Sequence, residues 1–307
     1  MSSKSELEVE GRKLTVSNLE KVLYPEAGFT KAQVIDYYVR IAPVLLPHLK
    51  NRPITLKRYP DGVDGFFFYE KQCPSHRPEW VQTATVPSQR EEGHIDYCVI
   101  NGLPAIVWAA NLADLELHTF LHRAPAITRP LAMVFDLDPG PPADIVLCCE
   151  VALWLKKLFD KVELECLVKT SGSKGLQLYV PLNTAVTYDR TKAFAHTIAE
   201  HFEKLHPDKV VSRMQKSLRK GKVLIDWSQN DDHKTTVSAY SLRARAHPTV
   251  STPVTWAEIS RTLRSGKADG LTFLTEDTLK RVEKHGDLFE PLLKLKQRLP
   301  PISALQA

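Results

Sequence analysis

The order of strand and helix patterns in the middle of the chain most constrains its fold. Residues 131–138, LAMVFDLD, have the pattern of a buried strand and are followed by Pro-Gly, a turn signal. The later patterns are an amphipathic helix over 143–160, strands over 162–170 and 176–182, a helix over 188–205 and a strand over 222–228. Strands interleaved with helices in this way indicate an α/β or α+β protein.

The flanking segments add elements to both ends of this pattern. Thr30 is expected to cap a helix that begins at Lys31, because its hydroxyl can accept a hydrogen bond from the first helical turn. Residues 94–120 are predicted to form a short strand, a turn and then an apolar helix, LPAIVWAANLADLELHTF. The Pro-rich stretch over 123–130 is the best candidate for a boundary between an N-terminal part and a core.

Length and composition exclude several classes of protein. The chain has 307 residues, enough for one large domain or two small ones, and its 43% hydrophobic and 25% charged residues exclude a mostly disordered chain. No run of about 18 apolar residues predicts a spanning helix, and the polar N-terminus does not resemble a secretory signal. The net charge of +5 permits a polyanionic partner without requiring one.

The five cysteines show neither metal-ligand spacing nor a disulfide framework, and their number is odd. This usage is typical of a reducing cytoplasm. We therefore expect buried structural thiols at Cys73, Cys98, Cys148, Cys149 and Cys166.

Two aspartates close the strand predicted over 131–138. Residues two apart in a strand point to the same face, so Asp136 and Asp138 project together while Phe135 and Leu137 face the core. Two carboxylates this close repel each other unless a positive charge lies between them, and a divalent cation with oxygen ligands is the usual solution. Taken alone, the same residues are also typical of a strand that ends in a turn.

A second signal is the segment 169–175, KTSGSKG, which joins two predicted strands. Its small residues let backbone amides face one concavity, and Ser171, Ser173 and Lys174 add donors, which suits phosphate oxygens. The spacing of a P-loop is absent and no helix is predicted to follow. A flexible hairpin loop is the alternative interpretation of this segment.

A third carboxylate, Asp226, ends the apolar run over 223–225. Because Lys234, Arg243 and Arg245 follow it, the segment suits a site for a metal-bound nucleotide. An exposed strand end is the simpler explanation of Asp226 on its own.

Two further segments combine charges or aromatic rings. Residues 213–222 hold five basic residues and no acidic one, which suits a nucleic-acid backbone, although most such runs are solvated faces. Residues 65–69, GFFFY, are flanked by Lys57, Arg58 and Lys71, which suits base stacking with phosphate contacts. Strand alternation predicts that two of these four rings face the core and two face outward.

Together these segments form an ordered set that favours nucleotidyl transfer. Three acids can hold two metal ions for in-line displacement at phosphorus, and the loop and trailing cations can bind a triphosphate. The sequence motifs of zinc proteases, α/β-hydrolases and protein kinases are absent. We therefore expect transfer of a nucleotidyl group from a nucleoside triphosphate to a 3′-hydroxyl.

The chain resembles the polymerase domain of bacterial ligase D, a member of the archaeo-eukaryotic primase superfamily that acts in non-homologous end joining. The likeness covers nearly the whole chain, and its most specific segments are VFDLDPG, KTSGSKGLQLYVPL and KVLIDWSQN, in this order. It implies an α+β fold with two facing β-sheets flanked by helices and an RRM-like half that carries the catalytic acids. It also implies a single primase-polymerase domain over 1–307, with an N-terminal subregion of about 1–125 and a catalytic core of about 126–307.

The resemblance implies roles for individual residues. The catalytic and metal-binding triad is Asp136, Asp138 and Asp226, for two ions of Mn²⁺ or Mg²⁺. The nucleotide-binding positions, for an NTP or dNTP, are His118, Ser171, Ser173, Lys174, Gln177, Lys234 and Arg243. The DNA-binding positions are Lys21 and Lys31 for a downstream 5′-phosphate, Phe68 and Tyr69 beside the template, Arg219 at the primer end, and Lys57.

Gln177 departs from the family's pattern. The family usually has histidine at this position of S-G-x-K-G-x-H, and that histidine contacts the incoming triphosphate. Glutamine keeps hydrogen-bonding capacity but cannot become cationic. We therefore expect nucleotide binding to be weakened without loss of the chemistry.

The implied activity is that of a template-directed DNA/RNA polymerase that fills short gaps, extends ends and prefers ribonucleotides. It implies DNA with a gap or break bearing a 5′-phosphate as substrate, Ku and a DNA ligase as partners, no membrane, and a cytoplasmic location on a bacterial or archaeal nucleoid. Two alternatives stay open: a primase-polymerase of the same superfamily that starts strands de novo, and a catalytically weak module that bridges DNA ends.

Overall fold

The computed structural model describes residues 4–88 and 93–305, and the chain divides into two compact units. Unit 1 comprises residues 1–125, 235–251 and 273–286, and unit 2 comprises residues 126–234, 252–272 and 287–307. The first division lies within the predicted boundary stretch, but the chain returns to unit 1 twice, so residues 126–307 do not form one continuous unit. That the whole chain is a single primase-polymerase domain stays a prediction.

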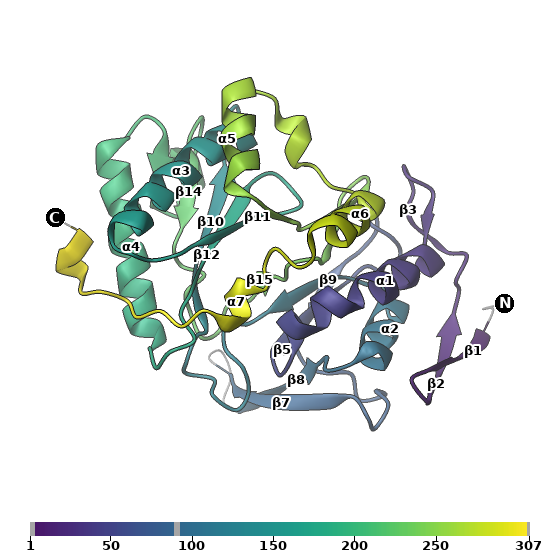
Figure 1. Cartoon of the computed structure of the whole chain (residues 1–307). Coiled ribbons are helices and arrows are strands. Elements are labelled where there is room, and N and C mark those ends of the chain that lie inside the picture. Colours follow the sequence, from purple (N-terminus) through teal and green to yellow (C-terminus); the bar gives the residue numbers. More distant parts are fainter. Residues whose placement is uncertain (1–3, 89–92, 306–307) are drawn as a thin grey trace. The chain divides into compact units, whose positions relative to one another are not determined.

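Unit 1 is built on a six-stranded sheet with the order β15-β9-β5-β8-β7, in which β6 also pairs with β5. Its strands are β5 (Pro53–Arg58), β6 (Phe68–Glu70), β7 (Gln82–Pro87), β8 (His94–Val99), β9 (Asp114–Thr119) and β15 (Thr236–Val237). Three hairpins pair β1 (Lys4–Val9) with β2 (Arg12–Ser17), β3 (Val22–Tyr24) with β4 (Phe29–Thr30), and β16 (Leu242–Ala244) with β17 (Pro248–Val250). Helix α1 (Lys31–Leu49) contacts α2 (Leu103–Asn111) and α6 (Thr275–His285), as Figure 1 shows.

Helix α1 begins where the sequence predicts. The Thr30 hydroxyl accepts a hydrogen bond from the Gln33 amide at 3.4 Å, and the Gln33 side chain accepts one from the Thr30 amide at 2.8 Å. This reciprocal arrangement is a capping box, which satisfies backbone donors that the first helical turn leaves open. The inner face is tied to the rest of unit 1, because the hydroxyls of Tyr37 and Tyr38 donate to backbone carbonyls at 2.8 and 2.7 Å.

The prediction of a helix that runs to residue 120 is wrong for its second half. Helix α2 ends at Asn111, Ala113 adopts a left-handed conformation with φ of 57°, and the following residues form strand β9. This strand pairs with β5 on one side and β15 on the other. Pairing on both edges satisfies the backbone of residues 114–119, and this tertiary context overrides their helical pattern.

Unit 2 is built on a second six-stranded sheet, with the order β13-β14-β10-β12-β11-β18. Its strands are β10 (Ala132–Pro139), β11 (Leu167–Thr170), β12 (Leu176–Pro181), β13 (Val210–Val211), β14 (Val223–Asp226) and β18 (Pro253–Val254). Its α-helices are α3 (Ile145–Lys161), α4 (Tyr188–Leu205), α5 (Trp256–Ser265) and α7 (Pro291–Lys294), and short 3₁₀ helices span Lys216–Leu218, Ala268–Leu271 and Ile302–Leu305.

The chain order β10-α3-β11-β12-α4-β14 defines the RRM-like half. In the sheet these strands lie in the order β14-β10-β12-β11, so the first strand is central and lies between the fourth and the third. This is the β-α-β-β-α-β arrangement of ferredoxin-like and RRM-like folds. The predicted α+β class is confirmed, and strand β10 lies at the centre of the sheet that carries the acidic residues.

Strand β10 is anchored in the core of unit 2. Phe135 and Leu137 are fully buried, and α3 and α4 both contact the strand. The buried Asn230 side chain donates to the Val134 carbonyl at 2.7 Å and accepts from the Val134 amide at 2.8 Å. These two bonds fix the segment after β14 against β10.

Two of the five cysteines are not free thiols. Cys73, which follows β6, and Cys98, on β8, form a disulfide with their Cα atoms 5.0 Å apart. The expectation of thiols is therefore wrong for this pair, whose partners are brought together by the sheet and not by sequence spacing. Cys148, Cys149 and Cys166 are buried free thiols, as predicted.

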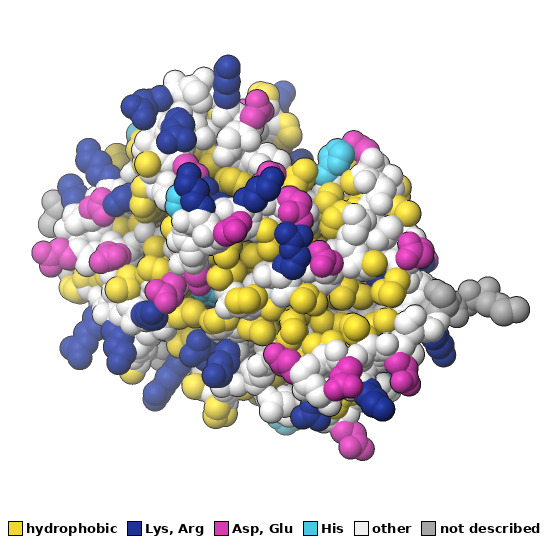
Figure 2. Space-filling model, turned by 45° about the vertical axis from the view of Figure 1, so that its right-hand side comes forward, with side chains coloured by type: hydrophobic (Ala, Val, Ile, Leu, Met, Phe, Trp, Pro, Cys, Tyr) yellow, Lys and Arg dark blue, Asp and Glu magenta, His cyan; other side chains and the backbone are white. Residues whose placement is uncertain are grey.

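The described part of the chain has no helix with the length and apolar character needed to cross a membrane. On the face drawn in Figure 2, basic and acidic side chains both occur, with hydrophobic side chains between them. This mixture agrees with the modest net charge of +5.

Candidate active site

Three carboxylates meet on neighbouring strands of unit 2. Asp136 on β10 lies directly opposite Asp226 on β14, and Asp138 lies two residues further along β10. Burial, together with repulsion from Asp226 and Asp138, raises the pKa of Asp136 to about 6. We call these three residues the acidic cluster, and its crowded negative charge has the chemistry of an oxygen-ligand site for divalent cations.

The carboxylates of the acidic cluster are held differently. Asp226 accepts hydrogen bonds from the Ser228 amide at 2.9 Å, the Ser228 hydroxyl at 2.6 Å and the Gln229 amide group at 2.9 Å. Lys234, a predicted nucleotide-binding cation, in turn donates to the Ser228 hydroxyl. Ser228 therefore links Lys234 to Asp226. Asp138 is about half exposed and forms an ion pair with Arg219 at 3.3 Å.

Two glycines let loops approach the strand that carries the acidic cluster. A Cβ atom on Gly175 would lie 1.9 Å from the carbonyl oxygen of Leu137, and one on Gly140 would lie 2.0 Å from the carbonyl oxygen of Arg219. The 171–175 loop therefore passes directly against the residue between Asp136 and Asp138. The basic segment 213–222 likewise approaches Gly140, the residue after β10, through the backbone of Arg219. A side chain on either glycine would prevent the approach.

The 171–175 loop is partly closed by its own hydrogen bonds. The Ser171 hydroxyl accepts from the amides of Ser173 and Gly175, both at 3.2 Å, and the Ser171 amide donates to the Gly175 carbonyl at 2.9 Å. Two amides predicted to face a ligand are thus engaged by Ser171, while the Lys174 side chain is exposed. Phosphate binding by this loop stays a prediction.

Unit 1 holds a second group of predicted site residues around Glu116 on β9, which the sequence analysis missed. Its carboxylate lies 3.3 Å from Lys57 Nζ, 2.9 Å from His118 Nε2 and 3.3 Å from Arg243 Nε. Although burial opposes it, the His118 hydrogen bond and the nearby cations hold the pKa of Glu116 well below its usual range. Burial lowers the pKa of His118 despite Glu116. Three predicted ligand-binding side chains are therefore fixed by one buried carboxylate.

The aromatic run beside this group is more exposed than predicted. Phe66, Phe67 and Tyr69 are 70%, 45% and 54% exposed, so the expected two-in, two-out alternation is wrong. Strand β6 begins only at Phe68, so most of the run precedes the strand. Phe66 instead stacks on Phe68, and Phe67 meets Tyr69 edge-on. Lys57 Nζ lies 4.8 Å from the Phe67 ring centre and 5.3 Å from that of Tyr69.

The two lysines predicted to bind a 5′-phosphate lie at the start of α1. Lys31 is its first residue, is almost fully buried, and donates to the Ser17 carbonyl at 2.7 Å. Lys21 is more exposed and forms an ion pair with Asp61 at 3.1 Å. Burial, followed by the charges of Lys21 and Arg58, lowers the pKa of Lys31 to about 8. A helix N-terminus with nearby cations is an environment that suits a phosphate.

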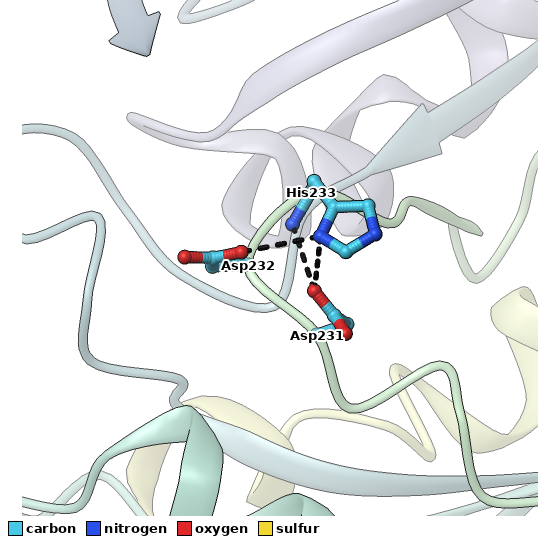
Figure 3. Close-up of side chains that lie close together, drawn as sticks. All are labelled: Asp231, Asp232 and His233. Carbon is cyan, nitrogen blue, oxygen red and sulfur yellow. Dashed lines mark hydrogen bonds and ion pairs between the residues drawn. The ribbon is translucent and has the colours of Figure 1, made fainter. Parts of the chain in front are cut away.

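A further cluster follows the acidic cluster in sequence, and Figure 3 shows its three side chains, Asp231, Asp232 and His233. Their possible ligand atoms all lie within 4.8 Å of one another. However, Asp231 is already paired with Lys192 and His233, and although burial opposes it, the Lys192 hydrogen bond lowers the pKa of Asp231. We interpret this cluster as a compensated group of ion pairs.

Comparison with known proteins agrees with this fold and these motifs. The model of the LigD primase-polymerase domain matches residues 30–289. The multifunctional non-homologous end joining protein LigD of Mycolicibacterium smegmatis is 42% identical over an alignment of 286 residues that covers 91% of this chain and 36% of that protein. The bifunctional LigD of Bacillus subtilis is 30% identical over 294 residues, covering 95% of this chain and 46% of that protein.

A solved structure also resembles this chain. The polymerase domain from Mycobacterium tuberculosis ligase D in complex with DNA matches with a TM-score of 0.84 and 39% identity, covering 92% of this chain and 99% of that one. The fold and the comparisons together define a nucleotidyltransferase of the primase-polymerase class. The chain belongs to the LigD primase-polymerase domain family, as its motifs predicted. It spans 36–37% of the length of the mycobacterial relatives it matches.

Proposed function

We propose that this domain is a template-directed DNA/RNA polymerase that fills short gaps and extends ends during non-homologous end joining. The observation that carries the proposal is the acidic cluster, in which Asp136 and Asp226 lie opposite each other and Asp138 follows on the same strand. The relatives are non-homologous end joining proteins by name, and the similar solved domain is in complex with DNA. Both support a DNA-repair polymerase.

The acidic cluster fits divalent cations. Carboxylate oxygens are preferred ligands of Mg²⁺ and Mn²⁺, and the repulsion that raises the pKa of Asp136 is what a bound cation relieves. Asp136, Asp138 and Asp226 would hold two such ions, which would lower the pKa of the attacking 3′-hydroxyl and offset the negative charge of the triphosphate and the pyrophosphate leaving group.

The side chains around the acidic cluster bind the substrates. Ser171, Ser173 and Lys174 donate to triphosphate oxygens, and Lys234 adds a cation next to the Ser228 that holds Asp226. Arg219, which reaches Asp138, orients the primer end. His118 and Arg243 are proposed as the nucleotide contacts of unit 1, on the strength of the motif resemblance.

The DNA-binding residues of unit 1 select the substrate. Lys21 and Lys31 bind the downstream 5′-phosphate at the start of α1, Phe68 and Tyr69 stack beside the template, and Lys57 contacts DNA. Ribonucleotides are the preferred substrates, and Ku and a DNA ligase are the partners. The place of action is the nucleoid of a bacterium or archaeon.

The test is extension of a primer across a short gap, with and without a 5′-phosphate, using NTPs or dNTPs and Mn²⁺ or Mg²⁺. We expect metal-dependent extension that the 5′-phosphate stimulates. Asp226→Asn should abolish extension and leave DNA binding intact, whereas Asp208→Asn, an exposed aspartate outside the acidic cluster, should extend normally.

Two outcomes would contradict the proposal. Phosphate-dependent DNA binding without extension in either metal would indicate a module that bridges ends. Synthesis that needs no primer would indicate a primase.

A further inference from the structure

We propose that Gln177 and the buried Lys169 form a positioning pair that sets the orientation of the Asp136 carboxylate, so that Gln177 acts within the sheet and not on the triphosphate. The inference rests on the proposed function, which assigns Asp136 to the metal site. It changes the role expected for Gln177 and assigns a role to Lys169, which the motifs do not single out.

The register of the sheet places the residues concerned in one row. Lys169 on β11 lies opposite Gln177 on β12, and Gln177 lies opposite Asp136 on β10. Asp136 in turn lies opposite Asp226 on β14. Directly opposed residues on neighbouring strands share a face of the sheet and have their Cβ atoms about 5 Å apart. Gln177 is therefore the neighbour of Asp136 on one side, as Asp226 is on the other.

Hydrogen bonding fixes which way the Gln177 amide points. Lys169 is fully buried, and its Nζ donates to Gln177 Oε1 at 2.7 Å, with the Tyr179 hydroxyl donating to the same atom at 3.4 Å. An ammonium group is a donor only, so the oxygen end of the amide must face Lys169. The NH₂ end is then left on the other side, where Asp136 is the opposed residue on β10. Lys169 thus dictates that Asp136 receives a donor.

Burial argues against a direct contact between Gln177 and the triphosphate. The residue is only 4% exposed, its amide oxygen accepts from Lys169 within the sheet, and Asp136 is the opposed residue on the other side. Turning toward a ligand would deprive the buried Lys169 ammonium of a hydrogen bond, which is costly. Neutral histidine, the usual residue of the family here, has one acceptor and one donor nitrogen. It could accept from Lys169 and donate to Asp136 in the same way.

The test measures metal binding directly, by titrating the nucleotide-free domain with Mn²⁺ and following the free ion by electron paramagnetic resonance. Gln177→Met keeps the volume but removes the acceptor for Lys169 and the donor group opposite Asp136. We expect it to weaken Mn²⁺ affinity by about 10- to 100-fold, the usual effect of losing a group that orients a metal ligand. Gln177→His should keep the wild-type affinity. Binding of NTP in a metal-free buffer should be the same in all three proteins.

Tyr179→Phe is the matched control, because it keeps the ring and leaves the shorter bond from Lys169 to the same oxygen in place. It should bind Mn²⁺ like the wild type, and thermal unfolding verifies that each variant is folded. The proposal is overturned if Gln177→Met weakens metal-free NTP binding and leaves Mn²⁺ affinity unchanged, or if Tyr179→Phe is as damaging as Gln177→Met.

A wild-type domain that binds no Mn²⁺ would refute the metal assignment of the proposed function. The positioning pair would still be tested by crystal structures of the wild type and Gln177→Met. We expect the Asp136 carboxylate to be rotated in the variant, and an unchanged orientation would overturn the proposal.

Discussion

Glu116→Gln tests whether one buried carboxylate holds the basic side chains of unit 1 in place. The Glu116 side chain is 2% exposed and lies 3.3 Å from Lys57, 2.9 Å from His118 and 3.3 Å from Arg243. Glutamine has the same shape but no charge, so the variant leaves the mostly buried Lys57 and Arg243 side chains without their counter-charge. Removing one partner of a buried ion pair costs about 3–5 kcal/mol. We expect the free energy of unfolding at neutral pH to fall by this amount, a large part of the roughly 5–15 kcal/mol typical of a domain.

The assay is equilibrium unfolding in urea, followed by tryptophan fluorescence. Glu276→Gln is the control, because Glu276 pairs with Arg40 on the surface and its side chain is 57% exposed. Such an exposed pair contributes about 1 kcal/mol or less. Equal losses of unfolding free energy in the two variants would refute the reasoning.

The pH dependence gives this prediction a second signature. Because the folded protein holds the pKa of Glu116 well below the ordinary value of 4.5, the carboxylate stabilises the folded state above that value. This contribution is lost as the pH falls below it toward the folded-state pKa. The difference in stability between wild type and Glu116→Gln should therefore shrink in acid, and a constant difference would contradict the assignment.

Three further predictions follow from single contacts. Since the pKa of Lys31 is lowered to about 8, affinity for a 5′-phosphorylated DNA end should decline as the pH rises above that value. Fluorescence anisotropy should show that Lys31→Met lacks this pH dependence. A wild-type affinity that does not change with pH would exclude Lys31 as the phosphate ligand. Gly175→Ala would place a Cβ atom 1.9 Å from the carbonyl oxygen of Leu137, so gap extension should be lost. In the control Gly270→Ala, the added Cβ atom has no neighbour within 4 Å, and extension should be normal. Full activity of Gly175→Ala would show that the loop can move without consequence. The Cys73–Cys98 disulfide joins residues 25 positions apart, so its reduction should lower the free energy of unfolding by about 3.5 kcal/mol. Urea unfolding measures this change, and mass spectrometry counts the free thiols. An unchanged unfolding curve after complete reduction would contradict the prediction.

The elements predicted correctly are those with signals inside one segment. The helix over 188–205 has the bounds expected from its hydrophobic pattern, and the Thr30 cap is confirmed because the capping residue and its partner Gln33 are three positions apart. The alternation of buried and polar residues in β10 likewise places Asp136 and Asp138 on one face. None of these inferences needs knowledge of a distant strand.

Contacts between distant strands could not be predicted in the same way. That Asp136 lies opposite Asp226 depends on the register of β10 with β14, which is set by packing of the whole sheet. Glu116 was hidden by the same limitation, because residues 103–120 were interpreted as one helix. In a strand, Glu116 and His118 share a face, so the alternation in L-E-L-H-T was the available signal for a charged pair.

Gln177 shows why a departure from a family motif needs its three-dimensional neighbours. In the sequence alone, glutamine in place of histidine removes a potential cation from the predicted phosphate-binding loop. This loss of a cation predicts weaker nucleotide binding. The register instead places Gln177 between the buried Lys169 and Asp136, where the requirement is one acceptor and one donor. Glutamine meets that requirement without a charge, and a permanent cation there would lie against Lys169 and be repelled. The substitution therefore conserves the hydrogen bonding of the sheet, and the affinity to measure first is that for the metal.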